Sequence, residues 1–315
     1  MVHRSKTHFA KRVNRYAAAV ERRGIIATYA LHDKLLSNKA ARRKLSHDVP
    51  TLDPLQQRLL DSLRTEGYAV LSFSELFPEP DRWQALDAET KRFVAETEKG
   101  LAREAAGEES GLRRTGKEFV VRRNAYGATV ETGDPWLSVC TDRRLLDLAN
   151  AYLELWSKLE YLDLWYTAPH GDDADRRGSQ HWHRDYDDRY LLKVFVYLTD
   201  VDEQTGPFQY VPGSQPGGRF DDVWPWSPMS PSYPPQDELA ARIEPSAKTL
   251  TGPKGTMFLC NTSGFHRGGY VTHTPRVLAT ASYCSPASLK ALTERNFSLQ
   301  NEAEGLDEPV RYALD

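Results

Sequence analysis

The chain has 315 residues, of which 27% are charged and 40% are hydrophobic, and its formal net charge at pH 7 is -3. This length can bury a full hydrophobic core, and the composition is that of an ordinary globular protein. No run of about 18 apolar residues occurs, so no transmembrane helix is predicted, and the first residues lack the apolar core of a signal peptide. Cys140, Cys260 and Cys284 have no metal-site spacing, so we expect reduced thiols and a cytoplasmic protein.

Charge is distributed unevenly along the chain. Residues 1–50 contain 12 Lys and Arg against 3 Asp and Glu, a balance of +9, which leaves -12 for the remainder. Phe9, Val13 and Tyr16 recur at helical spacing, so we expect a basic helical arm over residues 1–50. Two interpretations stay open. The arm contacts an anionic partner, such as lipid head groups, a phosphorylated substrate or nucleic acid, or it packs on the main domain with a solvated basic face.

The main domain is expected to span residues 51–315 and to begin with helices. A stripe of leucines from Leu52 to Leu63 predicts a helix that ends at Gly67. The other elements expected in this half are a strand at 68–73, a helix from about 81, a polar mobile loop at 100–116, a strand at 117–123 and a helix at 136–153.

From Tyr161 onward the pattern becomes that of β-structure, with short segments rich in Val, Tyr, Phe and Thr between Gly or Pro residues. Residues 213–245 are rich in Pro and Trp, and a stretch of this length is typical of a functional lid or of disorder. Helices followed by antiparallel strands predict an α+β chain around a jelly-roll barrel. The expected strands are 161–168, 190–199, 207–212, 256–261, 265–272 and 276–284.

Candidate metal ligands lie in two of these segments. His183 and Asp185 are two residues apart, so on a strand both side chains point to the same face. His266 comes later, beside glycines. Two imidazoles and one carboxylate form a facial triad that suits iron(II) and leaves three adjacent positions open. Two of these positions suit a chelating 2-oxo acid and the third suits dioxygen.

Arg276 begins the strand that follows His266. Its planar guanidinium can bind the distal carboxylate of 2-oxoglutarate through two hydrogen bonds. Each residue alone has an ordinary explanation: a histidine in a turn, a polar residue beside glycines, or a surface ion pair. Their combination, in this order and on predicted strands, is much more specific.

At these motifs the chain resembles the phytanoyl-CoA dioxygenase family. The similarity covers about residues 55–290. It implies a double-stranded β-helix, a cupin-like jelly roll with flanking helices. The segments that carry the similarity are Trp182–Asp185, Leu192–Val201, Gly206–Phe208, Val211–Ser214, Gly255–Thr256, Asn261–Thr262 and His266–Gly268.

The resemblance also implies roles for individual residues. His183, Asp185 and His266 correspond to the iron ligands that carry catalysis, and Arg276 corresponds to the 2-oxoglutarate anchor. Gln215 and Asn261 depart from the family's usual residues, but neither position is a ligand. The carboxylate at position 185 favours hydroxylation over halogenation, because related halogenases have a small residue there.

Other residues are expected near the cofactors. Lys193 interrupts an apolar strand, where an unpaired ammonium group would be costly, so we expect it to bind 2-oxoglutarate or an acidic substrate. Tyr166, Gln180 and Thr256 are expected to line the 2-oxoglutarate pocket. His181 competes with His183 as a ligand, but only His183 stands two residues before the carboxylate. His181 is therefore expected in the substrate pocket, Lys117 and Arg122 are expected to face an anionic substrate, and His170 and His273 are expected at the surface.

The predicted function is that of an iron(II)- and 2-oxoglutarate-dependent dioxygenase, which hydroxylates an unactivated C–H bond and releases succinate and CO2. Its substrate is a small molecule or a lipid-linked one. A lipid-linked sugar is one specific hypothesis, in which the protein contacts the membrane through residues 1–50. Two other classes stay open: a non-catalytic cupin-like metal-binding protein and a nucleic-acid-binding module, although no nucleic-acid motif is recognisable.

Overall fold

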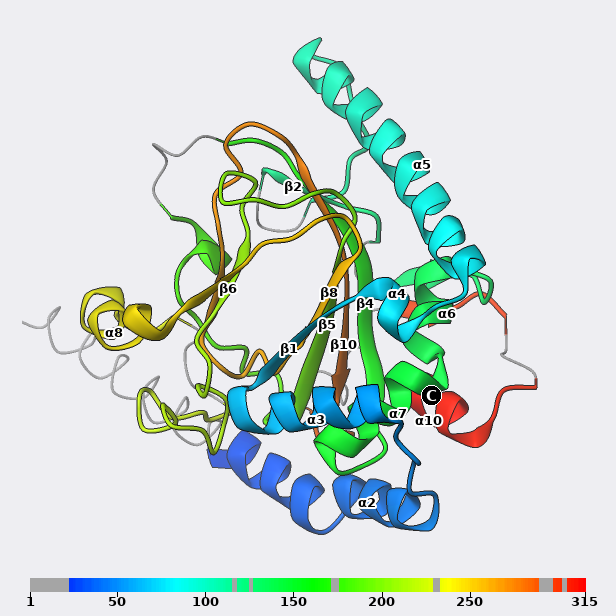
Figure 1. Ribbon diagram of the computed structural model, residues 1–315, viewed down its shortest axis with the longest axis vertical. Coiled ribbons are helices and arrows are strands. Elements are labelled where there is room, and N and C mark those ends of the chain that lie inside the picture. Colours follow the sequence, from blue (N-terminus) through cyan, green and yellow to red (C-terminus); the bar gives the residue numbers. More distant parts are fainter. Residues whose placement is uncertain are drawn as a thin grey trace, which may run out of the picture.

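Two antiparallel sheets form the centre of the computed structural model (Figure 1). The structure describes residues 23–114, 118–124, 127–170, 176–228, 233–288, 297–301 and 305–315. The larger sheet has the order β1 (Tyr68–Ser72), β8 (Thr256–Cys260), β5 (Leu191–Tyr197), β10 (Arg276–Cys284), β4 (Lys158–Thr167) and β2 (Val120–Arg122). The smaller sheet has the order β7 (Lys248–Leu250), β6 (Phe208–Tyr210) and β9 (His266–Gly268). This arrangement confirms the predicted jelly roll.

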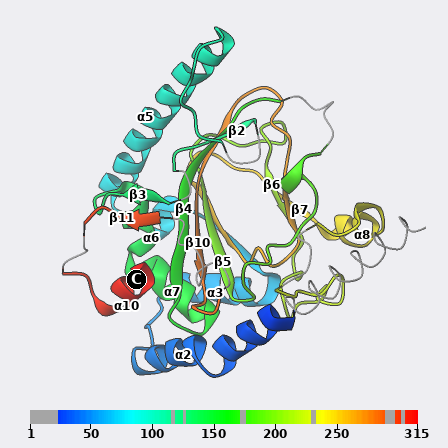
Figure 2. The same ribbon diagram turned by 180° about the vertical axis from the view of Figure 1, so that it is seen from behind.

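Most helices cover the outer side of the larger sheet, whereas α8 lies beside the smaller sheet, and a short parallel pair of strands lies beside the first group (Figure 2). The helices are α2 (Ser37–His47), α3 (Pro54–Glu66), α4 (Phe73–Leu76), α5 (Pro80–Ala105), α6 (Pro135–Thr141), α7 (Arg143–Leu153), α8 (Gln236–Ile243) and α10 (Glu308–Leu314). The parallel pair is β3 (Ala128–Val130) with β11 (Phe297–Leu299). In the part of the chain that the structure describes, no helix is both long and apolar enough to cross a bilayer.

Alternation along the strands separates two cores. On β5, Val194 and Val196 belong to the cluster beneath the helices, whereas Phe195 and Tyr197 pack between the two sheets. The inner cluster includes Phe208 from the smaller sheet, so the two sheets share a core. Because side chains on a strand alternate between faces, every second residue of β5, β10 and β4 is directed to the space where the site lies.

The elements differ from the sequence predictions in several places, and the helices α4, α8 and α10 were not predicted. The polar segment expected as a loop from residue 100 instead continues α5 to Ala105. The helix expected over 136–153 is two helices, α6 and α7, because the Asp142 side chain accepts a hydrogen bond from the Arg144 N–H and caps α7. Strands β3, β7 and β11 were not predicted, and each has three residues, too few to show a clear period.

The turn between α3 and β1 requires glycine. Asp53 and Gln56 form a capping box at the start of α3, and Gly67 ends it with φ of 78°. A Cβ atom at this position would collide with the side chains of Gln215 and Tyr210. The predicted helix end at Gly67 is therefore confirmed, and this turn fixes the entry of the chain into the barrel.

Residues 23–50 pack against the barrel. A helix covers residues 23–34 and is followed by α2. The Tyr29 hydroxyl donates to Asp188 Oδ1 at 2.7 Å, and the Ala287 N–H donates to Asn38 Oδ1 at 2.9 Å. Phe9, Val13 and Tyr16, whose spacing predicts a helical arm, lie outside the described residues.

Asp188 gives a test of this packing. Burial raises its pKa to about 6, above the ordinary value of an aspartate. The folded protein therefore binds a proton on Asp188 more tightly than the unfolded chain does, so the free energy of unfolding should fall as pH rises from about 4 to 6, by roughly 3 kcal/mol. We expect Asp188→Asn to remove most of this slope in urea unfolding measured across that range. Asp61→Asn on the exposed side of α3 should keep it, and an unchanged slope in Asp188→Asn would contradict the assignment.

Candidate metal centre

A backbone bridge brings the two candidate histidine ligands together. His183 and His266 form an isolated antiparallel pair, with N···O distances of 3.1 and 3.0 Å, and their ring centroids are 4.1 Å apart. The Asp185 N–H donates to the Thr262 carbonyl at 2.8 Å. Thr262 lies four residues before β9, so this bond places Asp185 beside both rings.

The three side chains offer a donor set for one ion. One ligand atom from each of His183, Asp185 and His266 lies within 4.8 Å of the others. Each imidazole uses Nδ1 against a backbone carbonyl, of His181 at 2.9 Å and of Gly264 at 3.0 Å. With Nδ1 protonated, Nε2 of each ring carries the lone pair that a metal ion needs.

Asp185 is held by Lys193. The lysine Nζ lies 2.6 Å from Asp185 Oδ2, and His266 Nε2 lies 3.7 Å from the same oxygen. Burial opposes ionisation of Asp185, but Lys193 and the two imidazoles outweigh it, so the pKa of Asp185 falls far below its usual range. Burial lowers the pKa of His266. An ionised carboxylate and a neutral imidazole are the forms that bind a divalent metal.

The triad opens into a cavity of about 280 Å³ between the two sheets. Aromatic rings flank the ligands on both sides: Tyr233 stacks on His183 at 5.3 Å and Phe208 stacks on His266 at 5.5 Å. The other residues that line the cavity are Arg122, Glu160, Tyr161, Trp165, Ser179, Asp187, Lys193, Phe195, Gly268, Arg276, Leu278, Thr280 and Ser282.

Arg276 lies in the same cavity as the triad, at the start of β10. Its side chain is buried, and it donates to the Gly206 carbonyl and, at 3.5 Å, to Thr167 Oγ1. Its buried Nε has no hydrogen-bond partner among the described residues. A buried cation with an unused donor is costly unless an anion completes it, so this site fits the carboxylate of a 2-oxo acid.

Three residues expected at the 2-oxoglutarate pocket do not line the cavity. Tyr166 faces the helices, because it shares strand parity with Leu164 in the outer core. Gln180 contacts His170 Nε2 at 2.6 Å, and the Thr256 hydroxyl donates to the Pro253 carbonyl at 2.7 Å. Of the other expected residues, Lys193 and Arg122 line the cavity and His181 does not. His273 is exposed, and His170 is half-buried against Phe119. Lys117 lies outside the described residues.

A polar network on β4 and β2 forms one cavity wall, and of its members only Arg122 was predicted from the sequence. Arg122 Nε pairs with Asp163 Oδ2 at 2.5 Å, and the Tyr161 hydroxyl accepts from both Arg122 at 2.8 Å and the Trp165 indole at 2.6 Å. Burial raises the pKa of Asp163 despite the nearby guanidinium. The signal was present in the sequence, since residues 161, 163 and 165 share one strand face while the apolar residues between them face the helices.

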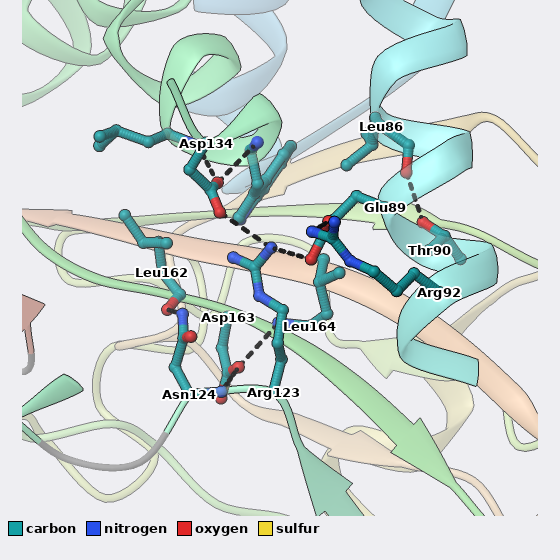
Figure 3. A network of polar contacts seen from close by, with 12 residues as sticks. Leu86, Glu89, Thr90, Arg92, Arg123, Asn124, Asp134, Leu162, Asp163 and Leu164 are labelled. Atoms are coloured by element: carbon teal, nitrogen blue, oxygen red, sulfur yellow. Dashed lines mark hydrogen bonds and ion pairs between the residues drawn. The ribbon is translucent and has the colours of Figure 1, made fainter. Parts of the chain in front are cut away.

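The next residue, Arg123, ties this wall to the helices behind it (Figure 3). Its side chain points toward Glu89 of α5 and Asp134, and it pairs with them at 3.1 Å and 2.9 Å. Asp163 accepts a second bond from the Asn124 N–H at 2.8 Å. Buried ion pairs of this kind hold position more than they add stability. Contacts within the network and contacts with the helices behind it therefore both hold this wall in place.

His183 and His181, which lie on either side of Trp182, allow a matched test of the triad. We expect His183→Ala to weaken Mn²⁺ or Fe²⁺ binding by more than the roughly 10–100-fold loss typical of changing a residue that only supports a ligand. His181→Ala should retain the affinity within a few-fold, because its ring does not line the cavity. Anaerobic titration followed by electron paramagnetic resonance of Mn²⁺ measures both variants. Equal losses, or a larger loss in His181→Ala, would contradict the ligand assignment.

Comparison with solved structures agrees with the fold. The epimerase SnoN from nogalamycin biosynthesis, described as non-heme and alpha-ketoglutarate-dependent, matches with 18% identity over 81% of this chain and 93% of its own, with a TM-score of 0.51. EctD from S. alaskensis, solved with 2-oxoglutarate and 5-hydroxyectoine, has 20% identity over 73% of this chain and 76% of its own, with a TM-score of 0.48. AviO1 from Streptomyces viridochromogenes has 17% identity over 76% of this chain and 98% of its own, with a TM-score of 0.49.

Comparison by sequence identifies the family. None of the curated proteins compared with the chain matches it. The model of the family described as phytanoyl-CoA dioxygenase (PhyH) matches residues 63–276, which is more than half of the chain and contains the triad and Arg276. The predicted class of enzyme, an oxygenase that uses iron and 2-oxoglutarate, agrees with this match. The chain belongs to the phytanoyl-CoA dioxygenase family.

Proposed function

We propose that this protein hydroxylates an unactivated C–H bond of a small-molecule substrate and converts 2-oxoglutarate and dioxygen to succinate and CO2. One oxygen atom enters the substrate and the other enters succinate, so the reaction balances. The observation that carries the proposal is the presence of the triad and the incompletely paired Arg276 in one cavity. Iron bound by His183, Asp185 and His266 would supply the activation of dioxygen.

The residues of the chain have separable tasks in this proposal. Arg276 holds the distal carboxylate of 2-oxoglutarate, because its guanidinium lines the cavity and its buried Nε has no partner among the described residues. Lys193 keeps the carboxylate of Asp185 in place. Phe195, Phe208 and Leu278 line the cavity and exclude water from it. The polar wall around Arg122 is left to contact the substrate.

The cavity limits the substrate. Its volume of about 280 Å³ is at the lower end of the range for ligand pockets and must also hold 2-oxoglutarate. The substrate is therefore small, or it inserts only the end that reacts, as the sugar of a lipid-linked molecule would. Tyr233, from the Pro- and Trp-rich segment, is half-exposed at the cavity, which supports the proposed lid role of residues 213–245.

Arg276 gives the sharpest test of the proposed reaction. With iron(II) and labelled 2-oxoglutarate, the protein should release succinate at a slow rate even without its substrate. Arg276→Met should raise the KM for 2-oxoglutarate by about 10–100-fold, since a charge-assisted bond is worth about 1.5–3 kcal/mol. Metal affinity should be unchanged, and Arg276→Lys should recover part of the loss.

Arg242→Met, on the exposed pair with Asp222, is the matched control and should leave the KM unchanged. Absence of succinate from the wild-type protein under all substrates of a metabolite library would favour a non-catalytic metal-binding barrel. Succinate release with an unaltered KM in Arg276→Met would instead leave the reaction in place and remove only the role of Arg276.

A further inference from the structure

The outer side of the residue 23–49 segment carries most of the exposed large hydrophobic side chains. Seven such side chains occur among the described residues, and five of them lie here: Ile26, Leu31, Leu35, Leu36 and Val49. An exposed leucine is unremarkable by itself, but a cluster on one segment marks an interaction surface.

The three leucines of this group lie together at the end of the helix that covers residues 23–34. Leu31, Leu35 and Leu36 are 46%, 62% and 48% exposed, and the N–H groups of Leu35 and Leu36 both donate to the Leu31 carbonyl. Leu31 and Leu35 are four residues apart, so they lie on the same side of the turn. We call Leu31, Leu35 and Leu36 the leucine corner.

The helix that leads to the leucine corner is fixed in its rotation. Tyr29 is 6% exposed and points to the barrel, where it bonds to Asp188 and contacts the Trp226 ring at 5.5 Å. Leu31 is two residues further along the helix and therefore on its opposite side. The packing of Tyr29 thus keeps the leucine corner directed outward instead of burying it.

Positive charge surrounds the leucine corner. Lys34, Lys39 and Arg43 are exposed, and none has a carboxylate partner among the described residues. The acidic groups of this segment are already engaged, Asp33 with Arg42 at 2.7 Å and Asp48 with Arg143 at 3.7 Å. The outer surface therefore combines apolar side chains with uncompensated cations.

We infer that this surface docks on an anionic lipid membrane. Leucines that insert at the head-group boundary, with lysines and arginines beside them, are what a peripheral membrane contact requires. The basic balance of +9 over residues 1–50 is complementary to such a surface. A protein partner would need carboxylates opposite the cations, and a nucleic acid would leave the leucines exposed. The proposed oxygenase activity does not depend on this docking.

The test is co-sedimentation of the full chain with lipid vesicles. We expect binding to vesicles of phosphatidylcholine with phosphatidylglycerol, and not to phosphatidylcholine alone. Lys34→Gln with Lys39→Gln and Arg43→Gln should weaken binding by roughly 100-fold at low salt, at about fivefold per charge near the surface. Leu31→Ser with Leu35→Ser and Leu36→Ser should also weaken it by at least about tenfold.

Val70→Ser is the matched control, since Val70 is 45% exposed on β1, away from this segment, and it should bind as the wild type does. Unchanged thermal unfolding of all variants establishes that they are folded. The inference is overturned if the wild type ignores anionic vesicles or if the leucine variant binds them equally. It is also overturned if the leucine variant converts a wild-type dimer to a monomer, which would identify the surface as a contact between two copies. Succinate release measured on the same samples reports separately on the proposed activity.

Discussion

The site depends on one short backbone pairing, the bridge between His183 and His266. It joins two segments more than 80 residues apart in sequence, and it extends the smaller sheet beyond β9. Because each histidine both donates to and accepts from the other through the main chain, the spacing of their rings does not rely on a bound ion. The third ligand, Asp185, is then placed by its own N–H bond to Thr262. A metal ion entering this site meets donors already oriented by the backbone, so little ordering cost remains at binding.

Strand parity explains which parts of the site the sequence could predict. The spacing of His183 and Asp185 and the apolar strands around them were sufficient to propose the triad, because a period of two residues is a strong local signal. The same rule, applied to β4, would have selected Tyr161, Asp163 and Trp165 and rejected Tyr166. What the sequence does not contain is the partner of each side chain. Gln180 and Thr256 do not line the cavity, because hydrogen bonds to His170 and to the Pro253 carbonyl hold their side chains elsewhere.

Some helix ends could be predicted from the sequence and others could not. Gly67, which ends α3 within one turn, could be predicted from the sequence. The break at Asp142 was hidden, because an aspartate in an apolar helical pattern is ordinary until its side chain is seen to cap the next helix. The polar end of α5 was predicted as a loop because its sequence has no clear helical signal. Its residues are exposed and lack a clear apolar face, yet α5 extends through them to Ala105.

Lys193 contacts Asp185, a candidate metal ligand, because its ammonium group needs a carboxylate partner inside the cavity. Arg122 is compensated by Asp163 and Lys193 by Asp185, while Arg276 has only carbonyl and hydroxyl partners. A divalent ion would add two further positive charges, beside a carboxylate that already serves Lys193. Among the described residues Arg276 has no carboxylate partner, so a bound carboxylate can neutralise its charge and a neutral ligand cannot. In the proposed reaction, Arg276 would bind the far carboxylate of 2-oxoglutarate, while Lys193 holds one oxygen of Asp185.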